Sequence, residues 1–284
     1  MPLRSALVPP RLGVATLAVS AASTLGPLTV DSGGRYLKTA SGTPWRYQCD
    51  GAWFICNHLS QADQDTYLAA LVAAGYNAAI LCLLEHPTTA WPQYGAPANF
   101  YGEAPFTTAN QFDTPNAAYF ARVNRYIDKA RSLGLIVPMF HTYSGFGGGD
   151  PGWEAVYTDG HNTNTVMRNW GIYLATTFTQ DNIIWMHFGD NTQAGTALTR
   201  FQNVVSGIQS ITRNRLSGSE IDYPNTQVTD QTGFTYGIDP GTSDMQLNSF
   251  YGQDPSGNGQ SYIDADVAWA YSPTLPSRLQ EPAY

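Results

Sequence analysis

The segment that decides the fold is Ala78–Leu84, which reads AAILCLL, an apolar run without a polar interruption. A strand that is buried on both faces, as in a parallel sheet covered by helices, has such a sequence, whereas a strand with one face in water alternates apolar and polar residues. Two similar runs follow, Leu135–Phe140 (LIVPMF) and Asn182–His187 (NIIWMH). The sequence therefore predicts a parallel β-sheet covered by helices.

Helical patterns separate these strands. One helix is predicted from Ser60 to Gly75, and it begins with a variant of the capping box in which Asp63 replaces the usual Glu. A second helix is predicted from Thr114 to Gly134, with Thr114 as its cap and Pro115 in its first turn. The other predicted helices are about Val166–Phe178, Ala197–Ile211 and Tyr262–Tyr271.

The remaining strands complete the predicted alternation of strands and helices. They are Trp45–Cys49, Leu216–Ile221, Met245–Tyr251 and a short strand that starts at Arg278–Glu281. Such alternation predicts an α/β fold, and 284 residues suit a (β/α)8 TIM-type barrel, which typically needs ~250. An open doubly wound sheet is the alternative, and we disfavour it because no Gly-rich nucleotide-binding turn follows the first strand.

The predicted barrel is incomplete at its C-terminal end, because the eighth strand is not in this chain. Either the barrel is left open or the chain is one piece of a longer protein. We favour the second interpretation, because an open parallel barrel would expose two strand edges.

The N-terminal part divides into an extension and a β-hairpin. Residues 28–45, LTVDSGGRYLKTASGTPW, predict the hairpin, with turns at Gly33-Gly34 and Ser41-Gly42. Residues 1–27 are an extension that is either a weak signal-like stretch or a retained attachment segment, and we favour the second because Pro9-Pro10 interrupts the basic region. The barrel domain then spans residues 28–284. No stretch reaches the ~20 apolar residues that a membrane span needs.

Composition restricts the possible partners. The net charge is −8 and no run of Lys or Arg exists, so we expect neither nucleic acid nor an anionic membrane surface as a partner. Aromatic residues make up 13% of the chain, and the flat apolar faces and polar edges of Tyr and Trp suit sugar rings. The three cysteines, Cys49, Cys56 and Cys82, lack zinc-ligand spacing and lie in or beside apolar segments, so we expect them to be buried, reduced thiols.

Several catalytic patterns are missing from the sequence. Without an HExxH or similar pair we expect no metal, and we expect no cofactor. Gly147–Asp150 lacks the Lys that follows the glycines of a phosphate-binding loop, and no Gly-x-Ser-x-Gly nucleophile elbow is present. A polysaccharide lyase is a minor alternative, because no predicted strand end offers the Arg that it would need.

Reactive groups of such barrels gather at the C-terminal ends of the strands. Nearly every predicted strand ends in a polar residue with useful chemistry. These residues are Asp50, Glu85, His86, His141, Asp190, Asn191, Tyr251 and Glu281. We expect His141 to donate or accept a hydrogen bond with substrate, and His187, one step inside a strand, to be a core residue. His58 and His161 read as loop residues.

Asp190 and Glu281 are the predicted catalytic pair. Hydrolysis of a glycosidic bond needs one carboxylic acid to protonate the leaving oxygen and one carboxylate at the anomeric carbon, ~5–5.5 Å away in a retaining enzyme. The ends of strands four and seven face each other across a barrel mouth. The alternatives are a helix N-cap for Asp190, together with Asn191, and a surface carboxylate for Glu281.

Several segments resemble those of apiosidase-like glycoside hydrolases. The segment Cys49–Trp53, CDGAW, is similar to the GDTAW of that family, and the resemblance covers about residues 28–284 in the family's order. The other matching segments are Gly75–Asn77, Asn99–Phe106, Pro115–Phe120, Asp181–Trp185, Gly189–Asn191 and Glu281–Tyr284.

The resemblance implies a (β/α)8 glycosidase that cleaves side-chain or terminal sugars from complex polysaccharides such as pectin, with retention. It implies Asp190 as the general acid/base and Glu281 as the nucleophile. The residues that would line the sugar site are Asp50, Trp53, Glu85, His141 and Tyr251. The family usually has Gly-Gly-Asp where this chain has Phe188-Gly189-Asp190, and its pattern continues with another Glu after the final Tyr.

Two functions therefore compete. The first is an active glycosidase, extracellular or at the cell surface, whose partner is a polysaccharide or oligosaccharide. The second is an inactive carbohydrate-binding or structural barrel module, for example in a virus particle, which the N-terminal extension would attach to a larger assembly.

Overall fold

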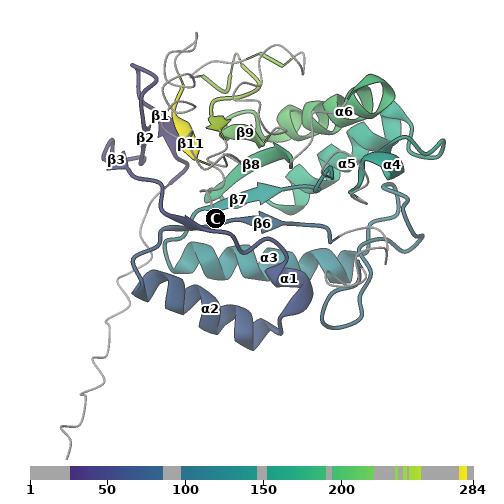
Figure 1. The fold of residues 1–284 in the computed structure, drawn as a ribbon, viewed down its shortest axis with the longest axis horizontal. Helices are drawn as coiled ribbons and strands as arrows, with labels where there is room; N and C mark the ends of the chain where they lie inside the picture. Colours follow the sequence, from purple (N-terminus) through teal and green to yellow (C-terminus); the bar gives the residue numbers. More distant parts are fainter. Residues whose placement is uncertain are drawn as a thin grey trace, which may run out of the picture.

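The computed structural model describes residues 26–85, 97–145, 152–189, 194–220, 234–235, 239–241, 243–250 and 275–279 (Figure 1). The strands are β1 (Thr29–Val30), β2 (Leu37–Lys38), β3 (Pro44–Trp45), β4 (Cys49–Asp50), β5 (Ala78–Ala79), β6 (Leu81–Cys82), β7 (Val137–Phe140), β8 (Ile183–Phe188), β9 (Ser217–Glu220), β10 (Asn248–Phe250) and β11 (Ser277–Leu279). The helices are α1 (Ile55–His58), α2 (Gln61–Ala73), α3 (Ala117–Ser132), α4 (Glu154–Tyr157), α5 (Asn164–Thr177) and α6 (Gly195–Thr212). No helix within these ranges is long and apolar enough to cross a bilayer.

The strands from β4 to β11 follow one another around the barrel in chain order, and all their pairings are parallel. The pairs β4–β5, β6–β7, β7–β8, β8–β9 and β10–β11 are all parallel. Single parallel bridges, Ala78 with Ile136 and Gly218 with Leu247, join the remaining gaps. This order confirms the predicted α/β architecture and has no reversal of the kind that a doubly wound sheet requires.

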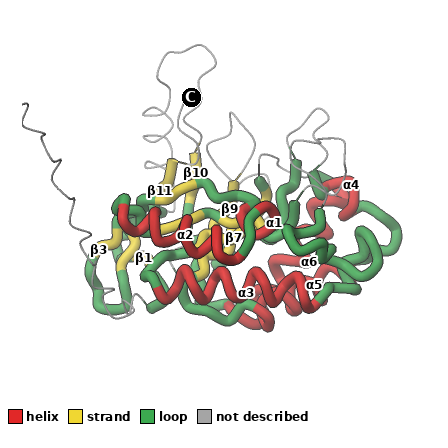
Figure 2. Tube along the Cα trace, turned by 90° about the horizontal axis from the view of Figure 1, so that it is seen from below, coloured by secondary structure: helices red, strands yellow, loops and turns green. Residues whose placement is uncertain are grey.

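The apolar run that predicted one strand is divided in two. Its first part, β5, pairs with β4, and its second part, β6, pairs with β7. Side chains alternate between two apolar clusters: Ala79 and Leu81 face the helices, whereas Ile80 and Cys82 face the barrel interior. Helices α3, α5 and α6 lie along one side of the molecule in Figure 2, with β10 and β11 along the other.

A small antiparallel sheet, β1-β2-β3, covers the N-terminal end of the barrel. Its apolar side chains belong to the interior cluster, together with residues at the beginnings of the barrel strands. These side chains are Leu28, Val30, Leu37 and Trp45 of the small sheet, and Ile136, Ile184, Leu216 and Leu247 of the barrel. The small sheet therefore closes one end of the barrel, and Figure 1 shows it at the end from which β6, β7 and β8 start.

The predicted turns of this sheet are present, but Trp45 is placed differently. Gly34 and Gly42 donate their N–H groups to the carbonyls of Asp31 and Thr39, at 3.0 and 2.8 Å. The second turn leads into a third strand, so the segment is a three-stranded sheet rather than one hairpin. Trp45 belongs to β3 and not to the first barrel strand, which is β4.

The helix ends show where capping was predicted well and where it was not. Ser60 caps α2 by accepting from the N–H of Asp63 at 3.2 Å, as predicted. The cap of α3 is Asn116, which accepts from the N–H of Ala118 at 3.1 Å, so the prediction of Thr114 as the cap was wrong. The Thr114 hydroxyl donates instead to the carbonyl of Gln111, at 3.0 Å, within the preceding loop.

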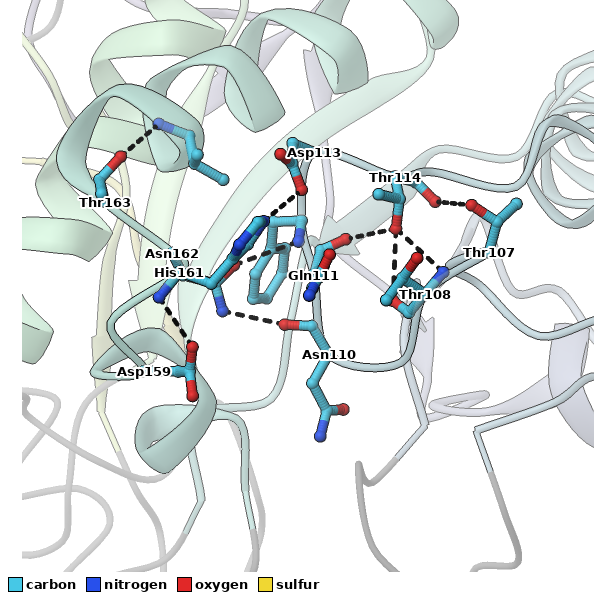
Figure 3. A network of polar contacts seen from close by, with 12 residues as sticks. Thr107, Thr108, Asn110, Gln111, Asp113, Thr114, Asp159, His161, Asn162 and Thr163 are labelled. Carbon is cyan, nitrogen blue, oxygen red and sulfur yellow. Dashed lines mark hydrogen bonds and ion pairs between the residues drawn. The ribbon is translucent and has the colours of Figure 1, made fainter.

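That loop is tied to the segment before α5 by a polar network (Figure 3). Asn162 is fully buried at its centre. Its side-chain oxygen accepts from the N–H of Phe112 at 3.2 Å, and its amide donates to the carbonyls of Asn110 and Val156, both at 2.9 Å. At the surface, His161 Nε2 lies 2.8 Å from Asp113 Oδ1. Two long connections are thereby held together.

Helices α5 and α6 approach each other closely through two glycines. A Cβ at Gly171 would lie 2.1 Å from the carbonyl oxygen of Val204, and a Cβ at Gly207 would lie 2.2 Å from that of Arg168. Both contacts are with backbone, which cannot move aside cheaply. The pair of glycines therefore sets the distance between the two helices.

We expect Gly207→Ala to destabilise the protein by about 1–3 kcal/mol, because the added methyl forces α5 and α6 apart and this cost exceeds the ~1 kcal/mol gained in helix propensity. The midpoint of urea unfolding measures the effect. Gly160→Ala is the matched control, since nothing lies within 4 Å of a Cβ at Gly160. Equal midpoints for the two variants would contradict the close approach.

Candidate active site

Four of the predicted site residues lie within the described part of the chain: Asp50, Trp53, Glu85 and His141. The other predicted site residues lie outside it. These are His86, Asp190, Asn191, Tyr251 and Glu281. The strands that precede them are described, however, so the geometry of the strand ends can be followed.

Glu85, which follows β6, is a fully buried carboxylate with a defined partner. Its Oε2 lies 2.6 Å from Nε2 of His58, at the end of α1, and its carbonyl accepts from the indole N–H of Trp153 at 2.9 Å. The His58 side chain is 47% exposed, so the pair connects a buried carboxylate with the surface. The prediction of His58 as a loop residue was wrong, because His58 ends α1, a helix too short to show a helical period in the sequence.

Asp50 ends the first barrel strand, β4, and is half-buried. Its Oδ2 accepts a hydrogen bond from the hydroxyl of Tyr67 on α2. Burial raises the pKa of Tyr67, and the bond to Asp50 raises it further, so the phenol stays protonated and remains a donor. Asp50 is thereby held in one orientation at the strand end.

An aromatic wall, formed by Trp53, Phe140 and Tyr143, lies at the C-terminal ends of β4 and β7. The ring centroids of Trp53 and Phe140 are 4.7 Å apart, and those of Trp53 and Tyr143 are 6.2 Å apart in an edge-on arrangement. The carbonyl of Trp53 accepts from the N–H of Cys82 at 2.7 Å, which fixes the loop over β6. Trp53 and Tyr143 are only half-buried, so they offer aromatic surface of the kind that binds sugars.

Glu220 is an acidic strand end that was not among the predicted site residues. It is the last residue of β9 and is buried, with 1% of its surface exposed. The predicted strand ran on to Ile221, which hid Glu220 within it. Burial raises the pKa of the Cys82 thiol, and the nearby carboxylates of Glu85 and Glu220 raise it further. Glu85, which follows β6, and Glu220, which ends β9, are thus both buried carboxylates at C-terminal strand ends.

The three cysteines are free, and Cys56 and Cys82 are buried as predicted, whereas Cys49 is half-buried. Burial raises the pKa of Cys56 and of Cys82, so both remain protonated thiols. No group of three or more potential metal ligands occurs among the described residues.

His141 lies away from the position expected of a sugar contact. It is fully buried, and its ring centroid lies 4.9 Å from that of Phe201 on α6 and 5.4 Å from that of His187. Odd-numbered residues of β7 and β8 face the helices, and both histidines follow that alternation. The structure therefore provides a buried histidine pair beneath α6 where the sequence predicted a substrate contact at His141.

The family follows from comparison with known proteins. Residues 31–284 match the family model described as "Apiosidase-like, catalytic domain". The chain belongs to the apiosidase-like family. The resemblance drawn from the sequence segments is thus confirmed. No curated protein matches the sequence.

Solved structures similar to this apiosidase-like chain show its fold. A glycoside hydrolase family 5 protein from Bacteroides vulgatus ATCC 8482 has a TM-score of 0.73 at 20% sequence identity. The match covers 93% of this chain and 55% of the Bacteroides chain. A second structure, named only as a glycoside hydrolase, has a TM-score of 0.72 at 20% identity, with 93% and 58% covered. A family 5 mannosidase from Rhizomucor miehei has a TM-score of 0.58 at 11% identity, with 90% and 72% covered.

These similarities confirm the TIM-type barrel. The chain spans little more than half the length of the first two structures.

Burial also fixes the charge of the histidine pair in this apiosidase-like domain. It lowers the pKa of His187 to about 3, and it lowers the pKa of His141 well below the ordinary value, with the neighbouring His187 adding to the effect. Neither nitrogen of His187 has a hydrogen-bond partner within the described part of the chain. Both rings are therefore neutral near pH 7.

We expect the free energy of unfolding to fall as the pH drops below ~6.5, the ordinary pKa of histidine in the unfolded chain. Between that pH and about 3 the unfolded chain binds a proton at His187 that the folded chain does not, so acid favours unfolding. The contribution of His187 to this loss is about 2 kcal/mol between pH 8 and pH 5. Urea unfolding at both pH values measures it.

His187→Gln should reduce this pH-dependent loss, whatever its effect on stability at pH 8. His161→Gln is the control, because the His161 side chain is 41% exposed and paired with Asp113. If both variants lost as much stability as the parent between pH 8 and pH 5, the neutral buried pair would not be the cause.

Proposed function

We propose that this domain is a glycosidase that hydrolyses glycosidic bonds in a complex polysaccharide by a retaining mechanism with two carboxylates. Membership of the apiosidase-like family supports the reaction class. The observation that carries the mechanism is the strand order. Because β4 to β11 run parallel in chain order, β8 and β11 are the fourth and seventh barrel strands and end at the same face.

The two catalytic carboxylates follow these strand ends in the sequence. Asp190 comes two residues after Phe188, the last residue of β8, and Glu281 comes two residues after Leu279, the last residue of β11. In a barrel of this type, the ends of strands four and seven face each other across the mouth. That placement is the one that a bound sugar between two carboxyl groups requires.

The proposed reaction has two steps. Glu281 attacks the anomeric carbon while Asp190 protonates the glycosidic oxygen, so the leaving sugar departs neutral and a glycosyl ester forms on Glu281. In the second step Asp190 takes a proton from water, which attacks the anomeric carbon and releases the sugar and the Glu281 carboxylate. Two inversions give net retention of configuration.

Described residues around the mouth supply the proposed binding contacts. Trp53 offers its half-buried ring to an apolar sugar face, and Asp50 and Glu85 accept hydrogen bonds from sugar hydroxyls. Asp50 and Glu85 are each held by a protein donor, Tyr67 and His58 respectively. His141 is left out of this proposal because of its position beneath α6.

A panel of plant, algal and bacterial polysaccharides, with detection of new reducing ends, tests the proposal. Release from at least one of them by the protein supports a glycosidase. No release from any of them, with binding retained to some, would favour the inactive carbohydrate-binding module instead.

Asp190→Asn should lower kcat/KM by about 10²–10⁴-fold on the substrate found in the panel, because the leaving oxygen is no longer protonated. The loss should be much smaller for an activated aryl glycoside, whose leaving group departs without a proton. Asp113→Asn, at the surface beside His161, is the matched control and should leave kcat/KM unchanged. Turnover by Asp190→Asn equal to that of the parent would refute the assignment.

Glu281→Gln should abolish turnover on every substrate, activated glycosides included, because no glycosyl ester can form. Glu154→Gln, in the first turn of α4, is the matched control. Intact-mass analysis of the parent with a slow 2-fluoro glycoside should show a covalent adduct, which Glu281→Gln lacks. An adduct that persists in Glu281→Gln would assign the nucleophile to another residue.

A further inference from the structure

The end of β8 holds a backbone conformation that its side chain disfavours. Phe188 has a φ of 70°, and Gly189 after it has a φ of 104°. Among the described residues, Asn110 is the one other non-glycine with positive φ, and Asn tolerates this region, whereas a bulky residue there is strained by about 1–3 kcal/mol. Such strain persists only where the surroundings enforce it.

Aromatic packing against α6 supplies that enforcement. The ring of Phe188 is fully buried and stacks on Phe201, with centroids 4.2 Å apart and planes at 9°. Phe234 contacts the same ring edge-on, with centroids 6.2 Å apart. With an ordinary negative φ, the side chain would leave this stack.

Backbone contacts hold the same two residues on both sides. The carbonyl of Phe188 accepts from the N–H of Ser144 at 3.3 Å, and the N–H of Gly189 donates to the carbonyl of Glu220 at 3.0 Å. Gly189 also has no space for a side chain, because its Cβ would lie 2.9 Å from Cδ2 of Tyr143 in the aromatic wall. The path of the chain is thus fixed up to the residue before Asp190.

We infer that Phe188 is a positioning residue: its stack on Phe201 keeps Phe188 and Gly189 at positive φ, and the catalytic function of Asp190, the next residue in the sequence, depends on this backbone. The inference rests on the proposed function, in which Asp190 is the acid/base. Glycine reaches positive φ without strain. In this chain a phenylalanine, Phe188, adopts positive φ, and its stack on Phe201 of α6 stabilises that conformation.

A double-mutant cycle tests whether Phe188 acts through Asp190. Phe188→Leu removes the stack and should lower kcat/KM on the polysaccharide substrate about 10- to 100-fold, the size of loss expected from a displacement of ~1 Å in a catalytic group. In the Asp190→Asn background the same substitution should change kcat/KM less than about two-fold, because the group that it displaces is already inactive. KM should stay close to that of the parent.

Two further variants keep the test decisive if Phe188→Leu folds poorly. Phe188→Met fills a similar volume without stacking, and Phe201→Leu removes the ring on the α6 side, so both should show the same dependence on Asp190. Phe178→Leu, in the same core cluster at the end of α5, is the control: it should lower stability without a selective loss of kcat/KM.

The outcomes separate this inference from the proposed function. Equal losses in the parent and Asp190→Asn backgrounds would overturn the positioning role and leave the glycosidase proposal intact. Parent-like activity of Asp190→Asn would instead refute the assignment of Asp190, on which the inference depends.

Discussion

The barrel strands β5 to β9 are buried on both faces, by helices on the outside and by the interior cluster within, and this double burial determines where chemistry can occur. A charged group in the middle of such a strand would be desolvated without compensation. Among the described barrel residues, the acidic side chains therefore lie at or just after strand ends, as Asp50, Glu85 and Glu220 do. His141 and His187 are the informative exceptions, because burial keeps their rings neutral and so tolerable in the helix-facing layer.

The fold was predictable because its signals are local and repeated. Apolar runs, the Ser60 cap and the turn glycines each point to the element that the structure contains. The two four-residue helices were not predictable, since they show no period, and neither was the Glu85–His58 contact, which joins residues distant in the chain. Glu220 was missed because the strand boundary was placed one residue too late. His141 was misplaced because a strand end alone does not determine which face the next side chain takes.

The end of β8 shows how one local rule can be overridden. Phenylalanine disfavours positive φ, yet the buried surface and stacking that Phe188 gains against α6 offset the backbone cost. The helices therefore do more than bury the outer face of the sheet: α6 also stabilises an unusual backbone conformation at a strand end. Through the contact between Phe188 and Phe201, helix α6 stabilises the backbone at the C-terminal end of β8, where the catalytic residues are predicted.

The small sheet β1-β2-β3 has a consequence for how the protein reaches its fold. It is synthesised before the barrel strands, but its apolar side chains rest on strand starts as far along the chain as Leu247. Contacts of such high sequence separation are expected to form late, because the entropy cost of closing a long loop comes before the contacts add any stability. Until most of the barrel has emerged from the ribosome, Trp45 and its neighbours have no complete surface to bury against.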